Sequence, residues 1–147
     1  MKNQVTVIMV SYKSSNIIEK SIKCISKKTS IIVIENSRDK KLKKELEKKY
    51  RNVKVIINKN NGFGRAANLG VKIAKSKYIL FSSPDIIFKE NAIKIFIDFA
   101  KKLKDRFGLL IPSNSKIKNI SLIKKPFGTP ILFVKKNVIF AKRQKIG

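Results

Sequence analysis

The chain has 147 residues and a formal net charge of +26, with 35 Lys and Arg against 9 Asp and Glu. This length suits one domain with a sizeable core, and the 43% hydrophobic content excludes a disordered composition. The absence of histidine excludes imidazole catalysis. The single cysteine, Cys24, excludes an internal disulfide and a zinc cluster and favours a reduced, cytoplasmic setting.

Two explanations of the positive charge stay open. Only five of the basic residues are arginine, and lysines are spread along the whole chain, as expected of an A/T-biased coding sequence and a solvated surface. The alternative is attraction to phosphates, nucleic acid or anionic lipid headgroups. The apolar start of the chain indicates a first strand and no signal peptide. No apolar run approaches the ~20 residues of a membrane span.

Apolar, β-branched runs alternate four times with segments of helical periodicity. Strands are expected at Val5–Val10, Ile31–Ile34, Val53–Ile57 and Tyr78–Phe81. Helices are expected at Ile17–Lys28, Lys40–Tyr50, Arg65–Ala74 and Asn91–Leu103. The alternation predicts βαβ units and an α/β fold with a mainly parallel sheet. Later signals are weaker: we expect strands at Leu109–Ile111 and Ile131–Val134, a loop at Pro112–Lys125, and little structure from Val138 to Gly147.

Polar residues follow the predicted strands where each strand ends. They are Ser11-Tyr12, Glu35 to Asp39, and Ser83-Pro84-Asp85, joined by the loop and helix start Asn61–Asn68. Because parallel strands end at one edge of a sheet, these segments are expected to converge on one cleft. Acids are scarce in this chain, so Glu35 and Asp85 at that edge are candidate binding groups. The alternative is that Asp39 caps a helix and Asp85 a turn.

The glycine-bearing loop after the third strand reads Asn-Asn-Gly-Phe-Gly-Arg. It has neither the spacing of a dinucleotide fingerprint nor that of a Walker A loop. Its glycines still allow close approach of a ligand to the backbone, and Arg65 at a helix start can reach a phosphate. The alternative is an ordinary loop with a surface arginine.

Four motifs in this order resemble family 2 glycosyltransferases of the GT-A fold, especially the rhamnosyltransferase-like branch. They are V-x-V-I-x-V-S-Y at 5–12, I-I-V-I-E-N-S-x-D at 31–39, N-N-G-F-G-R-A-A-N-L-G at 60–70 and Y-I-L-F-x-x-P-D at 78–85. The resemblance implies a Rossmann-like, three-layer α/β/α fold. It also implies a single nucleotide-sugar-binding domain over residues 1–147, with its core at 4–105 and a partial acceptor-side region at 106–147.

The resemblance further implies transfer of a sugar from a nucleotide-diphosphate donor to a glycan or lipid-linked acceptor in polysaccharide biosynthesis. Asp85 matches the last acid of the family's D-x-D-like motif, which would bind Mg²⁺ or Mn²⁺. Glu35 stands where the family usually has an aspartate that hydrogen-bonds the base. The donor-binding residues implied by position are Ser11, Tyr12, Glu35, Asn36, Asn61, Gly62, Arg65, Asn68 and Ser83.

The sequence departs from the family pattern in its later part. Family members usually carry an acidic pair there that supplies the general base, whereas no Asp or Glu follows Asp105 in this sequence. Three hypotheses follow: a truncated or split enzyme, a base supplied from elsewhere, or a donor-binding remnant without turnover. A basic nucleic-acid-binding domain is the rival from another class. A cytoplasmic protein is expected, with peripheral membrane contact suggested by charge alone.

Overall fold

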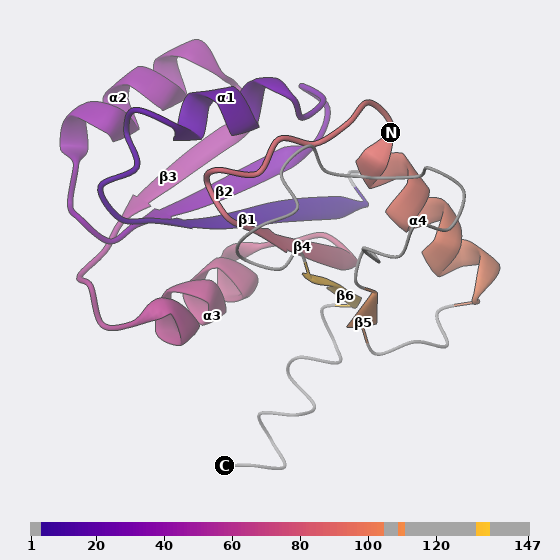
Figure 1. Cartoon of the computed structure of the whole chain (residues 1–147). Helices are drawn as coiled ribbons and strands as arrows, with labels where there is room; N and C mark the ends of the chain where they lie inside the picture. The colour runs from indigo at the N-terminus through magenta and orange to yellow at the C-terminus, as the bar shows by residue number, and fades with distance from the viewer. Residues whose placement is uncertain (1–3, 105–108, 111–131, 136–147) are drawn as a thin grey trace.

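The computed structural model describes residues 4–104, 109–110 and 132–135 (Figure 1). Strands and helices alternate through most of this part of the chain. The elements are β1 (Val5–Ser11), α1 (Ile18–Lys23), β2 (Ser30–Glu35), α2 (Lys40–Lys49), β3 (Val53–Ile57), α3 (Phe63–Ile73), β4 (Tyr78–Ser82), α4 (Ala92–Lys102), β5 (Leu109–Leu110) and β6 (Leu132–Lys135).

These strands form one sheet in the order β3-β2-β1-β4-β6-β5. The first four strands of the chain pair in parallel, whereas β6 is antiparallel to β4 and β5 is antiparallel to β6. The prediction of an α/β fold with a mainly parallel sheet is therefore confirmed. The predicted Pro112–Lys125 loop and the segment from Val138 lie outside the described residues.

The sheet lies between two layers of helices (Figure 1). On one face, Val7 and Met9 of β1 pack in a core shared with α1, α2 and α4. On the other face, Ile8 packs in a second core with Ala66 and Val71 of α3. Neighbouring residues of β1 thus point to opposite faces, and both faces are apolar. This double burial explains why the strands read as continuous hydrophobic runs.

Two predicted helix boundaries were wrong. The first helix ends at Lys23 and not at Lys28. The chain tightens there through bonds from Cys24 N to Ser21 O (3.2 Å) and from Ile25 N to Ile22 O (3.0 Å), three residues apart. Ile25 is still buried, so its spacing from Ile22 has the periodicity expected of a longer helix. The third helix begins earlier than predicted, at Phe63, because Gly62 takes the N-cap position.

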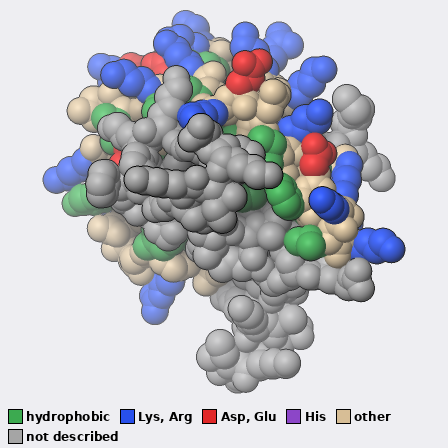
Figure 2. Space-filling view, turned by 45° about the vertical axis from the view of Figure 1, so that its right-hand side comes forward, with side chains coloured by type: hydrophobic (Ala, Val, Ile, Leu, Met, Phe, Trp, Pro, Cys, Tyr) green, Lys and Arg blue, Asp and Glu red, His purple; other side chains and the backbone are tan. Residues whose placement is uncertain are grey.

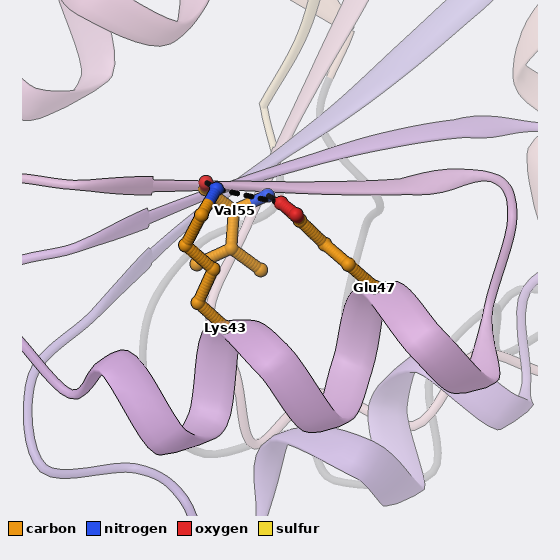
Figure 3. A network of polar contacts seen from close by, with 3 residues as sticks. All are labelled: Lys43, Glu47 and Val55. Atoms are coloured by element: carbon orange, nitrogen blue, oxygen red, sulfur yellow. Dashed lines mark hydrogen bonds and ion pairs between the residues drawn. The ribbon is translucent and has the colours of Figure 1, made fainter.

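The outer edge of β3 is covered by side chains of α2 (Figure 3). Lys43 Nζ donates to the carbonyl oxygen of Val55 (2.6 Å) and to Glu47 Oε1 (2.6 Å). The same Glu47 oxygen accepts a longer bond of 3.5 Å from Val55 N. An ion pair on one helix thereby satisfies both backbone groups of an edge-strand residue.

A second polar contact joins α1 to the end of α2. Glu19 Oε1 accepts from Lys49 Nζ (2.5 Å) and from the Tyr50 hydroxyl (2.7 Å). The hydrogen bonds from Lys49 and Tyr50 lower the pKa of Glu19 below its ordinary value. Desolvation, followed by the bond to Glu19, raises the pKa of Tyr50 to about 12. The contact thus extends the range of pH over which Glu19 is ionised to lower values, and the range over which Tyr50 is protonated to higher values.

We expect Gly70→Ala to destabilise the chain by about 1–3 kcal/mol, as overpacking of a full core does. A Cβ at Gly70 would lie 2.7 Å from Ile8 Cγ2 and 3.1 Å from Ile8 Cδ1, because α3 crosses close to β1. Helix propensity alone would favour alanine by about 1 kcal/mol. Gly64→Ala is the matched control, since nothing lies within 4 Å of its Cβ. Urea unfolding of both variants checks this; equal stability would contradict the close packing.

Lysine and arginine side chains surround the face shown in Figure 2, with few acids among them. Three ion pairs join described residues, namely Lys41–Glu45, Lys43–Glu47 and Lys49–Glu19. Most of the positive charge is therefore uncompensated by a nearby acid in this part of the chain. None of the described helices has the length and apolarity needed to cross a membrane.

Candidate functional site

The carboxyl ends of β1, β2, β3 and β4 lie at one edge of the sheet because these strands are parallel. Ser11 and Glu35 are register partners at the ends of β1 and β2. Backbone bonds continue beyond the strands: Asn36 N donates to Ser11 O (2.7 Å), and Asn58 N donates to Glu35 O (3.0 Å). The predicted meeting of distant polar segments at this edge therefore holds for the first three strands by direct contact.

Glu35 is fully buried, and one of its carboxylate oxygens holds the loop that follows β2. Oε2 accepts from the Ser37 hydroxyl (2.7 Å) and from the backbone N–H of Asp39 (2.9 Å). The other oxygen, Oε1, is buried and has no hydrogen-bond partner among the described residues. An unpaired buried carboxylate oxygen is costly, and a ligand N–H donor would relieve that cost.

Two residues that we did not predict as donor-binding complete this loop. The Ser37 hydroxyl oxygen accepts from the backbone N–H of Lys13 (3.1 Å), which ties the loop after β2 to the loop after β1. The amide of Asn58 donates to Asn36 Oδ1 (2.9 Å) and links β2 to β3 in the same way. Polar residues directly after strands were the available signal, but their pairing depends on strand register.

For Asp39, the alternative interpretation as a helix cap holds. Its Oδ1 accepts from the backbone N–H of Leu42 (2.9 Å) at the start of α2. A side-chain acceptor at this position satisfies one of the free N–H groups of the first turn. Asp39 therefore serves the fold through this bond.

Asp85 lies in the turn after β4, at the same edge of the sheet. The turn is closed by the backbone, with Ile86 N donating to Ser83 O (3.2 Å). Asp85 Oδ1 is buried and has no hydrogen-bond partner among the described residues, so this oxygen caps no described backbone N–H of the turn. No group of three or more His, Cys, Asp or Glu gathers anywhere in the residues described. A cation at Asp85 would thus complete its coordination with ligand, backbone or water oxygens.

The loop before α3 presents its polar groups to solvent. Gly62 has φ +100°, a conformation that side-chain-bearing residues rarely adopt, and it precedes the exposed first turn of the helix. Asn61 and Arg65 are exposed and Asn68 is half-buried. None of these three side chains has a hydrogen bond to another described residue. Phe63 beside them is 56% exposed, an apolar contact that we did not single out from the sequence.

Tyr12 and Ser83 complete the predicted set. Tyr12 directly follows β1 and is 52% exposed, with Lys13 Nζ 5.4 Å from the centre of its ring. Ser83 directly follows β4 and is half-buried. Both lie at the carboxyl edge by strand topology, where Ser82 at the end of β4 pairs with Met9 of β1.

This fold, a mainly parallel sheet between two helical layers with polar groups at its carboxyl edge, is that of GT-A glycosyltransferases. The sequence matches the family described as Glycosyl transferase family 2 over residues 6–140. The chain therefore belongs to glycosyl transferase family 2. It is also similar to the rhamnosyltransferase WbbL of Escherichia coli (strain K12), with 26% identity over 125 residues, 79% of this chain and 47% of that protein.

Solved structures show the same fold at low sequence identity. The S. aureus TarS 1-349 structure superposes with a TM-score of 0.72 at 17% identity, over 95% of this chain and 49% of that one. The mannosyltransferase PcManGT from Pyrobaculum calidifontis, in complex with GDP-Man and Mn²⁺, gives 0.75 at 14% identity, over 97% and 47%. The chain spans about half the length of these relatives.

Proposed function

We propose that the carboxyl edge of the sheet binds a nucleotide-diphosphate sugar through a divalent cation at Asp85. The sugar would pass to a glycan or lipid-linked acceptor in polysaccharide biosynthesis. The observation that carries this proposal is that Asp85 Oδ1 is buried and has no partner among the described residues of this family 2 chain. Cations relieve such an oxygen, and Mg²⁺ or Mn²⁺ on oxygen ligands neutralises the charge that develops on a diphosphate leaving group.

Different residues of the chain would contact different parts of the donor. Tyr12 offers an exposed aromatic face to the base, beside Ser11, Glu35 and Asn36 at the ends of β1 and β2. Glu35 Oε1 would accept an N–H of the base, since its other oxygen is already bonded within the chain. The exposed loop and first turn of α3 and the turn after β4 would also contact the donor. The residues proposed for these contacts are Asn61, Gly62, Arg65, Asn68 and Ser83.

Related structures support a donor of this class. TarS 1-349 has been solved in complex with UDP-GlcNAc and with UDP, and PcManGT with GDP-Man and Mn²⁺. The chain matches these structures over nearly its whole length, including the parallel strands that carry the candidate residues. Their donors differ in base and sugar, so these structures support a class of donor, and binding measurements must identify the base and the sugar.

Isothermal titration with UDP, GDP and dTDP, each with and without Mn²⁺, tests the proposal. We expect at least one nucleotide to bind, and to bind more tightly when Mn²⁺ is present. If none of the three binds under either condition, the donor site is refuted. Binding that is indifferent to Mn²⁺ would refute the metal site alone.

A donor-binding domain without turnover is the second candidate. It is favoured by the absence of Asp and Glu from residues 106–147, the region proposed to lie on the acceptor side of a single domain. Inverting transfer needs a base beside the acceptor hydroxyl. Donor hydrolysis assays separate the two candidates, because an active transferase releases nucleoside diphosphate from at least one common donor and a remnant releases none.

The charge of +26 supports two further proposals. One is a cytoplasmic protein with peripheral contact to an anionic membrane face; the other, from a different class, is a nucleic-acid-binding domain. Cell fractionation with salt washes tests the first, since a purely soluble pool would contradict it. Gel-shift titrations test the second, which requires sequence-selective binding that survives physiological salt.

A further inference from the structure

A cavity of about 600 Å³ opens at the opposite edge of the sheet from Ser11, Glu35 and Asp85. It is lined by residues near the starts of β1, β2 and β3 and by the connection from α3 to β4. The length of the parallel strands separates it from the candidate donor edge. It is therefore a second, independent place where a ligand could bind.

The lining of this cavity is cationic. Among the described residues, Arg51, Lys54 and Lys75 contribute to it, and no described Asp or Glu does. All three cations are exposed, and none forms an ion pair with a described acid. Arginine offers a planar fork of donors that matches an oxyanion, and the two lysines add charge from other elements. The cavity thus favours a compact anion with several acceptor oxygens.

A buried pair of hydroxyls at the cavity adds a neutral donor. Thr6 Oγ1 and Ser76 Oγ lie 2.5 Å apart, on β1 and on the turn before β4. Two hydroxyl groups carry two hydrogens, and the bond between them uses one. The second hydrogen can be turned toward a ligand, because Thr6 and Ser76 both line the cavity. Both residues are at least nine-tenths buried, so their position is fixed by the fold.

We propose that this cavity binds a phosphate group, held by the three cations and by the spare hydroxyl hydrogen of the Thr6–Ser76 pair. Phosphate is small, carries more than one negative charge near neutral pH, and has oxygens that accept bonds from several directions. The group can be free inorganic phosphate or the headgroup of a phosphatidic acid. Either would be recognised by the same side chains, without any contribution from the donor edge.

The test is a phosphate titration of the full chain followed by amide NMR at constant ionic strength. The variant Thr6→Val/Ser76→Ala removes the hydroxyl pair without changing charge, and we expect it to weaken phosphate binding about tenfold. If substitution in β1 prevents folding, Ser76→Ala alone replaces it. Saturable shifts should centre on the residues around the cavity, and their spread over the whole lysine-rich surface would overturn the proposal.

A charge-matched pair of variants separates the cavity from the general field of the protein. Arg51→Gln/Lys54→Gln/Lys75→Gln should abolish the saturable shifts. The control variant should retain the saturable shifts. It changes three exposed lysines that do not line the cavity to glutamine, namely Lys27, Lys44 and Lys102.

The source of the phosphate is decided by a parallel arm with vesicles. Sedimentation with phosphatidic acid vesicles, but not with phosphatidylcholine vesicles, that requires the cavity residues identifies a lipid headgroup. Cavity-dependent binding of inorganic phosphate alone identifies the free ion. If neither ligand discriminates the cavity variants from the charge control, the proposal fails.

Discussion

Replacing Asp85 by asparagine should weaken Mn²⁺-supported donor binding about a hundredfold and leave binding without metal nearly unchanged. Asparagine keeps the shape of the side chain but removes the charge that a hard divalent cation needs. Isothermal titration with the nucleotide that binds best to the unsubstituted chain, at several Mn²⁺ concentrations, measures both quantities. The loss should appear as a weaker metal response and not as a loss of the fold.

Stability gives the same variant a second readout. Because Asp85 Oδ1 is buried and pairs with no residue in the described part of the chain, removing its charge should leave the melting temperature unchanged or slightly higher. Asp98→Asn is the matched control, since Asp98 is exposed on α4 and the change in charge is identical. Equal donor affinity in the two variants would rule out a cation at Asp85.

The second large effect is expected from Glu35→Ala, which should destabilise the chain by about 3–5 kcal/mol. Its buried Oε2 holds the Ser37 hydroxyl and the Asp39 N–H, and bonds to a charged group contribute about 1.5–3 kcal/mol each. The free energy of unfolding of a domain is about 5–15 kcal/mol in total, so the expected loss is a large fraction of it. Urea unfolding followed by circular dichroism measures it.

Two comparisons sharpen this experiment. Glu35→Gln keeps an acceptor oxygen and should lose only part of that stability. Glu45→Ala removes an exposed acid that lies 3.9 Å from Lys41, and its cost should stay below about 0.5 kcal/mol. A loss under about 1 kcal/mol for Glu35→Ala would mean that the loop after β2 is held by other contacts.

The alternating elements were predictable because each strand is buried on both faces and each helix has one apolar side. Tyr78–Phe81 and Val53–Ile57 were expected within a residue of where they lie. The end of α1 was not, because burial of Ile25 gives the same spacing whether a helix continues or a tight turn carries the residue inward. The position of β6 between β4 and β5 depends on pairing between distant segments. Local sequence patterns do not predict which distant strands pair.

For the candidate site, the sequence indicated which residues follow strands, and the parallel sheet indicated that they share an edge. It did not indicate that Glu35 would be buried, with one oxygen bonded to its own loop. The bridge from Asn58 to Asn36 also depends on the register of β2 and β3. Such pairings are set by the three-dimensional alignment of strands, so the role of each side chain could not be assigned from spacing.

The ion pair on α2 that engages Val55 has a consequence for self-association. An unprotected edge strand is a template to which a strand of another molecule can add, and this is a common route to aggregation. Here the outward N–H and C=O of Val55 are already bonded, and the neighbouring Lys54 is exposed. A second copy approaching β3 at Val55 would meet an occupied N–H and C=O and a like charge at Lys54, which disfavours intermolecular β-pairing at this position.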